Sequence, residues 1–181
     1  MARVSLLEEN DHPDLAELIG KIKGARGGRL INIYRLMLHS PSLAKAWFDL
    51  NQAVRYGTEI DGRSRELAVI RVAILNHVEY VVRAHGPAYA LKEGLTPDQV
   101  TAVSDWRSSN LFSEKQRALL AYVDAMTCDI DVPENVFAEI RKHHTERQVV
   151  ELTMLIGAYN MLTRFLKALN VDPEPPLENN T

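Results

Sequence analysis

Apolar residues recur at intervals of three and four through most of this chain, and no stretch alternates convincingly as a strand. This spacing is typical of helices that bury one face. It predicts helices at residues 14–23, 30–38, 41–54, 62–75, 77–93, 97–105, 114–127, 134–143 and 145–169. We therefore expect an all-α fold, a single helical bundle of about eight or nine helices.

Residues with capping chemistry mark where several of these helices begin. Capping boxes, in which Ser or Thr is followed three residues later by Gln, start at Thr96, Ser113 and Thr145. Pro87 follows Gly86 inside the helix predicted over 77–93, and proline removes a helical hydrogen bond. We expect that helix to kink or split there.

The length and composition suit one globular domain. The chain has 181 residues, of which 46% are hydrophobic and 25% charged, and we place a single domain at residues 1–170. Residues 171–181 contain three prolines and no apolar periodicity, which predicts a flexible tail. The net charge is −3 and no dense Lys/Arg patch occurs, so we expect no nucleic-acid partner.

The last predicted helix is the most apolar part of the chain. Residues 149–169 are nonetheless interrupted by six polar or charged side chains, which favours a buried helix over a membrane span. We expect it to be buried on every side. The first 13 residues lack the apolar core of a signal peptide, and the single cysteine, Cys128, suits a reducing compartment. These features predict a cytoplasmic protein without a membrane partner.

Two segments in the middle of the chain carry the candidate chemistry. The first, residues 63–76, contains Glu66, and the second, residues 77–85, ends at His85. On the second segment Val78, Val81, Val82 and His85 follow one stripe of a helix, and Tyr80 lies on the stripe beside it. If the two helices pack as a pair, Glu66 and His85 approach each other. Spacing alone does not decide this.

These segments resemble the carboxymuconolactone decarboxylase family, which also contains the alkylhydroperoxidase-D-like proteins. The resemblance rests on HSPSLAKAWFDL, RSRELAVIRVA, NHVEYVVRAHGPAYALKEGLT and GAYNMLTRFLKAL, in the family's order, and spans roughly residues 25–170. It implies an all-α bundle of the alkylhydroperoxidase-D type that assembles into homo-oligomers, either trimers or hexamers.

The resemblance also assigns roles to individual residues. The peroxidase branch of the family carries Cys-x-x-Cys, a histidine four residues later and a glutamate upstream. Here the histidine matches His85 and the glutamate is similar in placement to Glu66, whereas both cysteine positions are valines, Val78 and Val81. Valine cannot replace a thiolate nucleophile. The resemblance therefore implies the decarboxylase-like branch, with His85 as proton donor, Glu66 as its partner and Tyr80 as a donor to an enolate.

A substrate-binding wall is expected around these groups. We assign it His77, Val78, Val81, Asn160 and Arg164, the last two because they follow one stripe of the final helix together with Thr153 and Gly157. Arg164 would hold a substrate carboxylate. The alternative is that Asn160 and Arg164 form a polar seam between subunits.

Each of these residues also has a purely structural interpretation. His85 can satisfy a backbone carbonyl, Glu66 can balance Arg63 or Arg65 at a solvated helix start, and Tyr80 can be a core aromatic. His77 and His85 would lie about 80° apart around one helix, and no acidic triad accompanies them. We expect no metal and no cofactor.

The sequence thus predicts a lyase like the carboxymuconolactone decarboxylases, acting by acid–base chemistry on a small carboxylated or lactone-type substrate of aromatic or small-acid catabolism. One alternative is an alkylhydroperoxidase-like antioxidant that relies on Cys128 or on the thiols of a partner. Another is a non-catalytic oligomer that binds a small ligand. The relative positions of Glu66, Tyr80 and His85 distinguish catalysis from binding.

Overall fold

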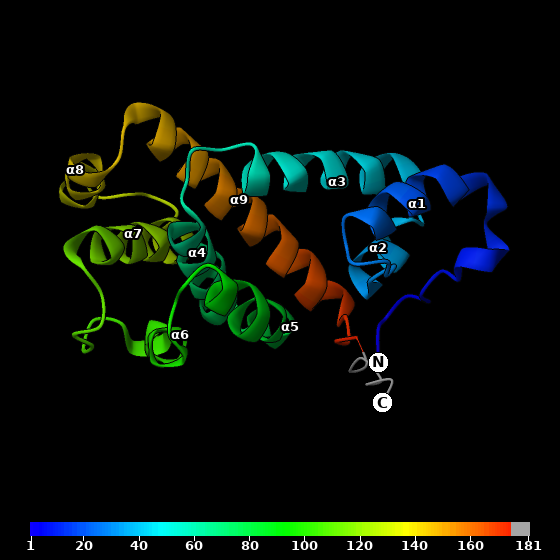
Figure 1. The fold of residues 1–181 in the computed structure, drawn as a ribbon, viewed down its shortest axis with the longest axis horizontal. Helices are drawn as coiled ribbons and strands as arrows, with labels where there is room; N and C mark the ends of the chain where they lie inside the picture. Colours follow the sequence, from blue (N-terminus) through cyan, green and yellow to red (C-terminus); the bar gives the residue numbers. More distant parts are fainter. Residues whose placement is uncertain (175–181) are drawn as a thin grey trace. The chain divides into compact units, whose positions relative to one another are not determined.

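Helices make up the regular structure of the chain. The computed structural model describes residues 1–174, and among these residues there is no strand. Nine α-helices occur in this part, and short 3-10 and π turns join them (Figure 1): α1 Ala16–Gly24, α2 Asn32–Met37, α3 Pro41–Tyr56, α4 Gly62–Leu75, α5 Glu79–Ala84, α6 Pro97–Ala102, α7 Glu114–Asp124, α8 Glu134–His143 and α9 Glu146–Leu169. The predicted all-α class is confirmed.

The chain divides into two compact units, which are described separately. One comprises Met1–Gln52 and the chain from Leu166 onward, and the other comprises Ala53–Phe165. The boundaries fall within α3 and α9. The domain predicted over residues 1–170 includes the whole of the second unit and most of the first, and it stays a prediction.

The first unit is built around a small apolar core. Ile19 of α1, Leu38 at the end of α2 and Ala44 of α3 are buried there, and leucines from the N-terminal segment pack against them. The beginning of the predicted flexible tail is bonded to this unit, because the Asn32 backbone N–H donates to the Glu174 carboxylate at 2.8 Å. Residues 175–181, the rest of that tail, lie outside the described residues.

Helix α4 is the centre of the second unit. Asp61 caps its N-terminus by accepting a hydrogen bond from the Ser64 backbone N–H, and every residue from Ser64 to Ala73 is buried. The helix packs against α5, α7 and the turn His85–Ala90. Burial on all sides also encloses its charged side chains, Glu66 among them. Such charges need partners within the protein.

The connection from α4 to α5 differs from the prediction. Asn76 ends α4, His77 takes a left-handed conformation with φ 55°, and α5 begins at Glu79 instead of residue 77. His77 is exposed in this turn. At His85 the chain changes to a π-helical turn, His85–Ala90, which accommodates the proline at position 87. The hydrogen-bonding pattern thus changes at the predicted position, but the helix does not split there, because helical turns continue to Lys92.

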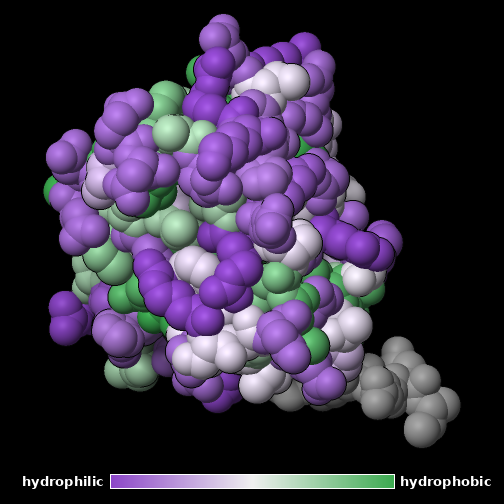
Figure 2. All heavy atoms as spheres, turned by 90° about the vertical axis from the view of Figure 1, so that its left-hand side faces the viewer, coloured by the Kyte–Doolittle hydropathy of each residue, from purple (hydrophilic) through white to green (hydrophobic). Residues whose placement is uncertain are grey.

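Helix α9 is long but only partly enclosed. The prediction that it is buried on every side is wrong for the single chain, because Val150, Met154 and Met161 are more than half exposed. The helix is long and apolar enough to cross a membrane by length and composition, but 50% of the relevant window is buried in the protein, as in a core helix. The face of the second unit in Figure 2 is covered mainly by hydrophilic residues, with apolar residues scattered among them.

Candidate functional site

A cluster of buried charges in the second unit is centred on Glu66, whose side chain is 0% exposed. One carboxylate oxygen, Oε2, lies 2.6 Å from Nδ1 of His85. The other, Oε1, accepts hydrogen bonds from Arg55 Nη2 at 3.2 Å and from Arg65 Nε at 3.1 Å. A buried carboxylate with three charged or polar partners is held in a single orientation.

Four segments of the chain bring this cluster together. Arg55 is in the last turn of α3, and Glu66 is in the first half of α4, next to Arg65. His85 begins the π-helical turn that packs on α4. Tyr159 comes from the middle of α9. Residues more than 100 positions apart in the sequence therefore surround one imidazole ring.

Arg55 is the most connected side chain of the cluster. Its Nη1 donates to the Tyr159 hydroxyl at 2.9 Å and lies 3.3 Å from Nε2 of His85. The guanidinium also lies over two aromatic rings, 4.7 Å from the ring centre of Tyr89 and 5.3 Å from that of Tyr56. Its Nε atom is buried and has no hydrogen-bond partner.

The protonation of the pair follows from its surroundings. Burial would raise the pKa of Glu66, but the hydrogen bond from His85 and the charges of Arg55 and Arg65 lower it. Burial lowers the pKa of His85, and the two guanidinium groups act in the same direction against the opposing effect of Glu66. At neutral pH the carboxylate is therefore charged and the imidazole neutral. Because a carboxylate only accepts, Nδ1 carries the hydrogen and Nε2 is an acceptor.

The two predicted catalytic groups, Glu66 and His85, are thus brought into contact. Tyr80, Val78 and Val81 are buried in or next to α5, one or two helical turns before His85. Their roles stay predictions. The structure places two other phenols against His85, those of Tyr89 and Tyr159, at ring-centre distances of 5.1 and 5.6 Å.

The remaining predicted residues lie in other surroundings. Asn160 accepts from Asn76 at 3.0 Å and donates to Thr127 at 3.1 Å, and Arg164 donates to its side-chain oxygen at 2.6 Å. Arg164 is exposed, as is His77. The proposed carboxylate anchor therefore belongs to a polar network between the end of α4, α9 and the turn after α7. The substrate-binding wall and the polar seam between subunits both stay predictions, because all of these contacts lie within one chain.

Sequence reasoning missed Arg55, Tyr89 and Tyr159. Arg55 ends an amphipathic helix, where a cation is ordinary because it suits the helix dipole. Tyr159 is hidden in an apolar helix, where an aromatic residue is most simply explained as core. The only signal available was the nearness of Tyr89 to His85, four residues apart on the same turn.

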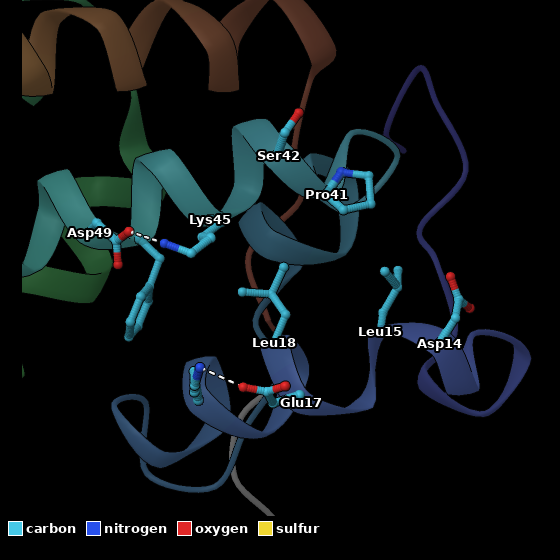
Figure 3. A pocket seen from close by; sticks show the side chains of 10 residues that line it. Asp14, Leu15, Glu17, Leu18, Pro41, Ser42, Lys45 and Asp49 are labelled. Atoms are coloured by element: carbon cyan, nitrogen blue, oxygen red, sulfur yellow. Dashed lines mark hydrogen bonds and ion pairs between the residues drawn. The ribbon is translucent and has the colours of Figure 1, made fainter.

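A hollow lies in the first unit, between α1 and the start of α3, away from the Glu66–His85 cluster (Figure 3). It has a volume of about 440 Å³, with Leu15 and Leu18 among its apolar lining residues. Two ion pairs border it, Lys21 with Glu17 at 2.7 Å and Lys45 with Asp49 at 2.6 Å. Each pair joins successive turns of one helix, so it stabilises that helix.

Within residues 1–174 no group of three His, Cys, Asp or Glu side chains is arranged to hold a metal ion.

Comparison with known sequences agrees with the resemblance of the central segment. Residues 41–125 match the model of the carboxymuconolactone decarboxylase family. The uncharacterized protein YnjA of Escherichia coli is 28% identical over 145 residues, which cover 80% of this chain and 74% of YnjA.

Solved structures show the same fold. One of them is a protein of unknown function from Agrobacterium tumefaciens, which is named as a candidate antioxidant-defence protein AhpD. It is 27% identical with a TM-score of 0.73, and the match covers 78% of this chain and 97% of that one. The debrominase Bmp8, in complex with 2,3,4-tribromopyrrole, has a TM-score of 0.80 at 20% identity, over 96% of this chain and 94% of its own. The latter likeness concerns the fold alone.

Proposed function

We propose that this chain, a member of the carboxymuconolactone decarboxylase and alkylhydroperoxidase-D-like superfamily, is a cytoplasmic carboxy-lyase. It removes carbon dioxide from a small carboxylated or lactone-type acid by acid–base chemistry. The observation that carries this proposal is the 2.6 Å contact between Glu66 and His85 inside the protein. A buried carboxylate that orients an imidazole is the arrangement used for positioned proton transfer.

The reaction places two demands on the site. When the bond to the carboxylate breaks, its electron pair moves into the substrate, and an adjacent carbonyl oxygen takes the negative charge as an enolate. Hydrogen-bond donors must hold that oxygen. Arg55 and the Tyr159 hydroxyl, 2.9 Å apart, supply donors of this kind beside His85.

The carbon that lost carbon dioxide must then receive a proton. His85 takes up a proton from solvent at Nε2 once the enolate has formed and passes it to that carbon, so that one proton is consumed for each carbon dioxide released. In the resting site Arg55 disfavours an imidazolium ion, because Nη1 is 3.3 Å from Nε2. The enolate charge offsets the guanidinium, and Glu66 stabilises the protonated ring, so protonation of His85 becomes favourable when the intermediate forms.

A dithiol peroxidase has no equivalent support in this site. Val78 and Val81, the residues at the two cysteine positions, are buried. Cys128 is exposed and lies in the turn after α7, on a different segment from His85. The Glu66–His85 pair therefore has no neighbouring pair of thiols to deprotonate, and acid–base chemistry on a bound substrate is the function we favour.

The test is release of carbon dioxide from a panel of small keto acids and carboxylated lactones. For any substrate that reacts, His85→Gln should lower kcat by about 10²–10⁴, the range for loss of a positioned acid or base. His39→Gln is the matched control, because His39 is an exposed histidine that bonds only a backbone carbonyl, that of Ser5. Undiminished turnover in folded His85→Gln would refute the proposed role of this residue.

A further inference from the structure

The buried cluster holds more positive than negative charge. Arg55 and Arg65 are both at most 8% exposed, whereas Glu66 is the single carboxylate enclosed with them. A second carboxylate, Glu93, bonds Arg65 at 2.7 Å, but its side chain is 36% exposed and it lies on the Arg65 side of the cluster. Arg55 therefore shares one carboxylate with another guanidinium and with His85. A buried cation that is partly neutralised favours an anion beside it.

Arg55 also has a donor to spare. Its Nε hydrogen is buried without an acceptor, although the side chain is only 6% exposed. Leaving a charged donor unsatisfied costs free energy that a ligand oxygen would recover. Aromatic rings surround the same guanidinium: Tyr89, which is 38% exposed, and Tyr56, which is 57% exposed. A small molecule that approaches Arg55 past these rings meets flat apolar surfaces.

The spacing of the polar groups restricts the ligand further. Arg55 Nη1 and His85 Nε2 are 3.3 Å apart. In an enolate, the oxygen that holds the charge and the carbon that accepts the proton are two bonds apart. A ligand that loses its carboxylate from the atom next to the carbonyl can therefore place that oxygen on Arg55 and that carbon at His85. Tyr89 contacts both groups, with its ring centre 5.1 Å from that of His85.

We propose that Arg55 is the residue that selects the substrate, and that the substrate class is cyclic acids with a flat ring and with the carboxylate on a tetrahedral carbon next to a ring carbonyl. Arg55 binds the carbonyl oxygen and holds it as the charge develops, while the ring lies against Tyr89. This inference rests on the proposed function, because it names the substrate class of the same site.

A stable planar oxyanion tests the anion site without any turnover. The probe is 4-nitrophenol, whose phenolate absorbs visible light, and 4-nitroanisole is its neutral match in shape. The wild-type protein should bind the phenolate in preference to 4-nitroanisole and should lower the pKa of the bound phenol. Equal binding of the two probes, with no change in the phenol pKa, would overturn the proposal.

Variants locate the effect on one guanidinium. Arg55→Met should reduce the preference for phenolate by about 10- to 100-fold, which corresponds to loss of a hydrogen bond to a charged group. Arg83→Met is the control, since Arg83 is exposed and pairs with Glu79. Tyr89→Leu should weaken both probes equally, because it removes ring contact without removing charge. A folded Arg55→Met protein that keeps the wild-type preference would contradict the proposal, and the wild-type measurement decides if this variant does not fold.

The two proposals fail in different ways. If the wild type binds phenolate through Arg55 but releases no carbon dioxide from cyclic β-keto acids of this class, the anion site is supported and the lyase function is refuted. If the wild type releases carbon dioxide and Arg55→Met has an unchanged kcat and KM, the lyase function stands and the role of Arg55 is refuted.

Discussion

Glu66→Gln is the most informative single change, because it removes one charge and almost no volume. Glu66 is fully buried and accepts from Arg55, Arg65 and His85. Glutamine keeps one oxygen for one of these donors but cannot balance two guanidinium groups. Both arginines would remain enclosed, with the partly exposed Glu93 as the nearest carboxylate for Arg65.

The expected cost follows from the degree of burial. Removing one partner of a buried ion pair lowers the free energy of unfolding by about 3–5 kcal/mol, because the other charge is left uncompensated. For a chain of this size each kcal/mol corresponds to about 2–4 °C, so the melting temperature should fall by about 6–20 °C. The double variant Glu66→Gln with Arg55→Met should recover part of this loss, since it removes one of the uncompensated charges.

Urea unfolding followed by circular dichroism measures these differences. The matched control is Glu79→Gln, which removes a carboxylate from an ion pair with Arg83 at 2.7 Å on the surface of α5. That pair is exposed, so its loss should leave stability nearly unchanged. A Glu66→Gln protein as stable as the control would show that the cluster is hydrated, and the argument from buried charge would fail.

Three further predictions follow from other features. Burial lowers the pKa of His85 and of His144 below the ordinary value of 6.5, so the unfolded chain takes up protons that the folded chain does not. The free energy of unfolding should therefore be highest above about pH 6.5 and fall as the pH decreases below it. Urea titrations at several pH values measure this fall, which should be smaller in His144→Gln. The purified protein should not reduce organic hydroperoxides with any dithiol donor. The result should be the same for the wild type and for Cys128→Ser. Consumption of thiol above background would contradict this prediction. We propose that the exposed apolar face of α9 contacts other copies of the chain. Met154→Glu should therefore shift the predicted trimer or hexamer towards monomer in light scattering. A wild-type protein that is already monomeric would contradict this prediction.

The helices could be predicted because the signals that form them are local. The capping boxes at Thr96, Ser113 and Thr145 each form in the structure, with both reciprocal hydrogen bonds present. Apolar spacing placed α4 at its observed bounds, because a helix buried on all sides is limited only by its caps. The start of α5 was misplaced because Asn76 and His77 form a turn that ends α4, and that turn depends on tertiary packing.

The site could be predicted only in part, since its members are joined through space. Glu66 and His85 lie on successive helices with a short connection, which made their contact a reasonable expectation. Arg55 reaches the pair from α3 and Tyr159 from α9, and no periodicity connects those helices to His85. The burial of α9 was overestimated for a related reason: composition reports how apolar a helix is but not what covers it.

With valines in place of the two thiols, we expect the buried arginines of this site to stabilise a different anion. Beside a thiol pair, buried positive charge would stabilise a thiolate made by the protein itself. Here Val78 and Val81 offer no anion, yet Arg55 and Arg65 remain buried with Glu66 as the one enclosed carboxylate. Glu93 pairs with Arg65 from the surface, and in our proposal the additional negative charge beside Arg55 comes from a molecule that enters the site. A planar oxyanion bound at Arg55 would supply this charge and would also allow His85 to become protonated. Binding of 4-nitrophenolate should therefore be accompanied by uptake of a proton. Calorimetry in buffers of different ionisation enthalpy measures that uptake. Binding without proton uptake would separate Arg55 from the acid–base pair and would leave His85 without its role as proton donor.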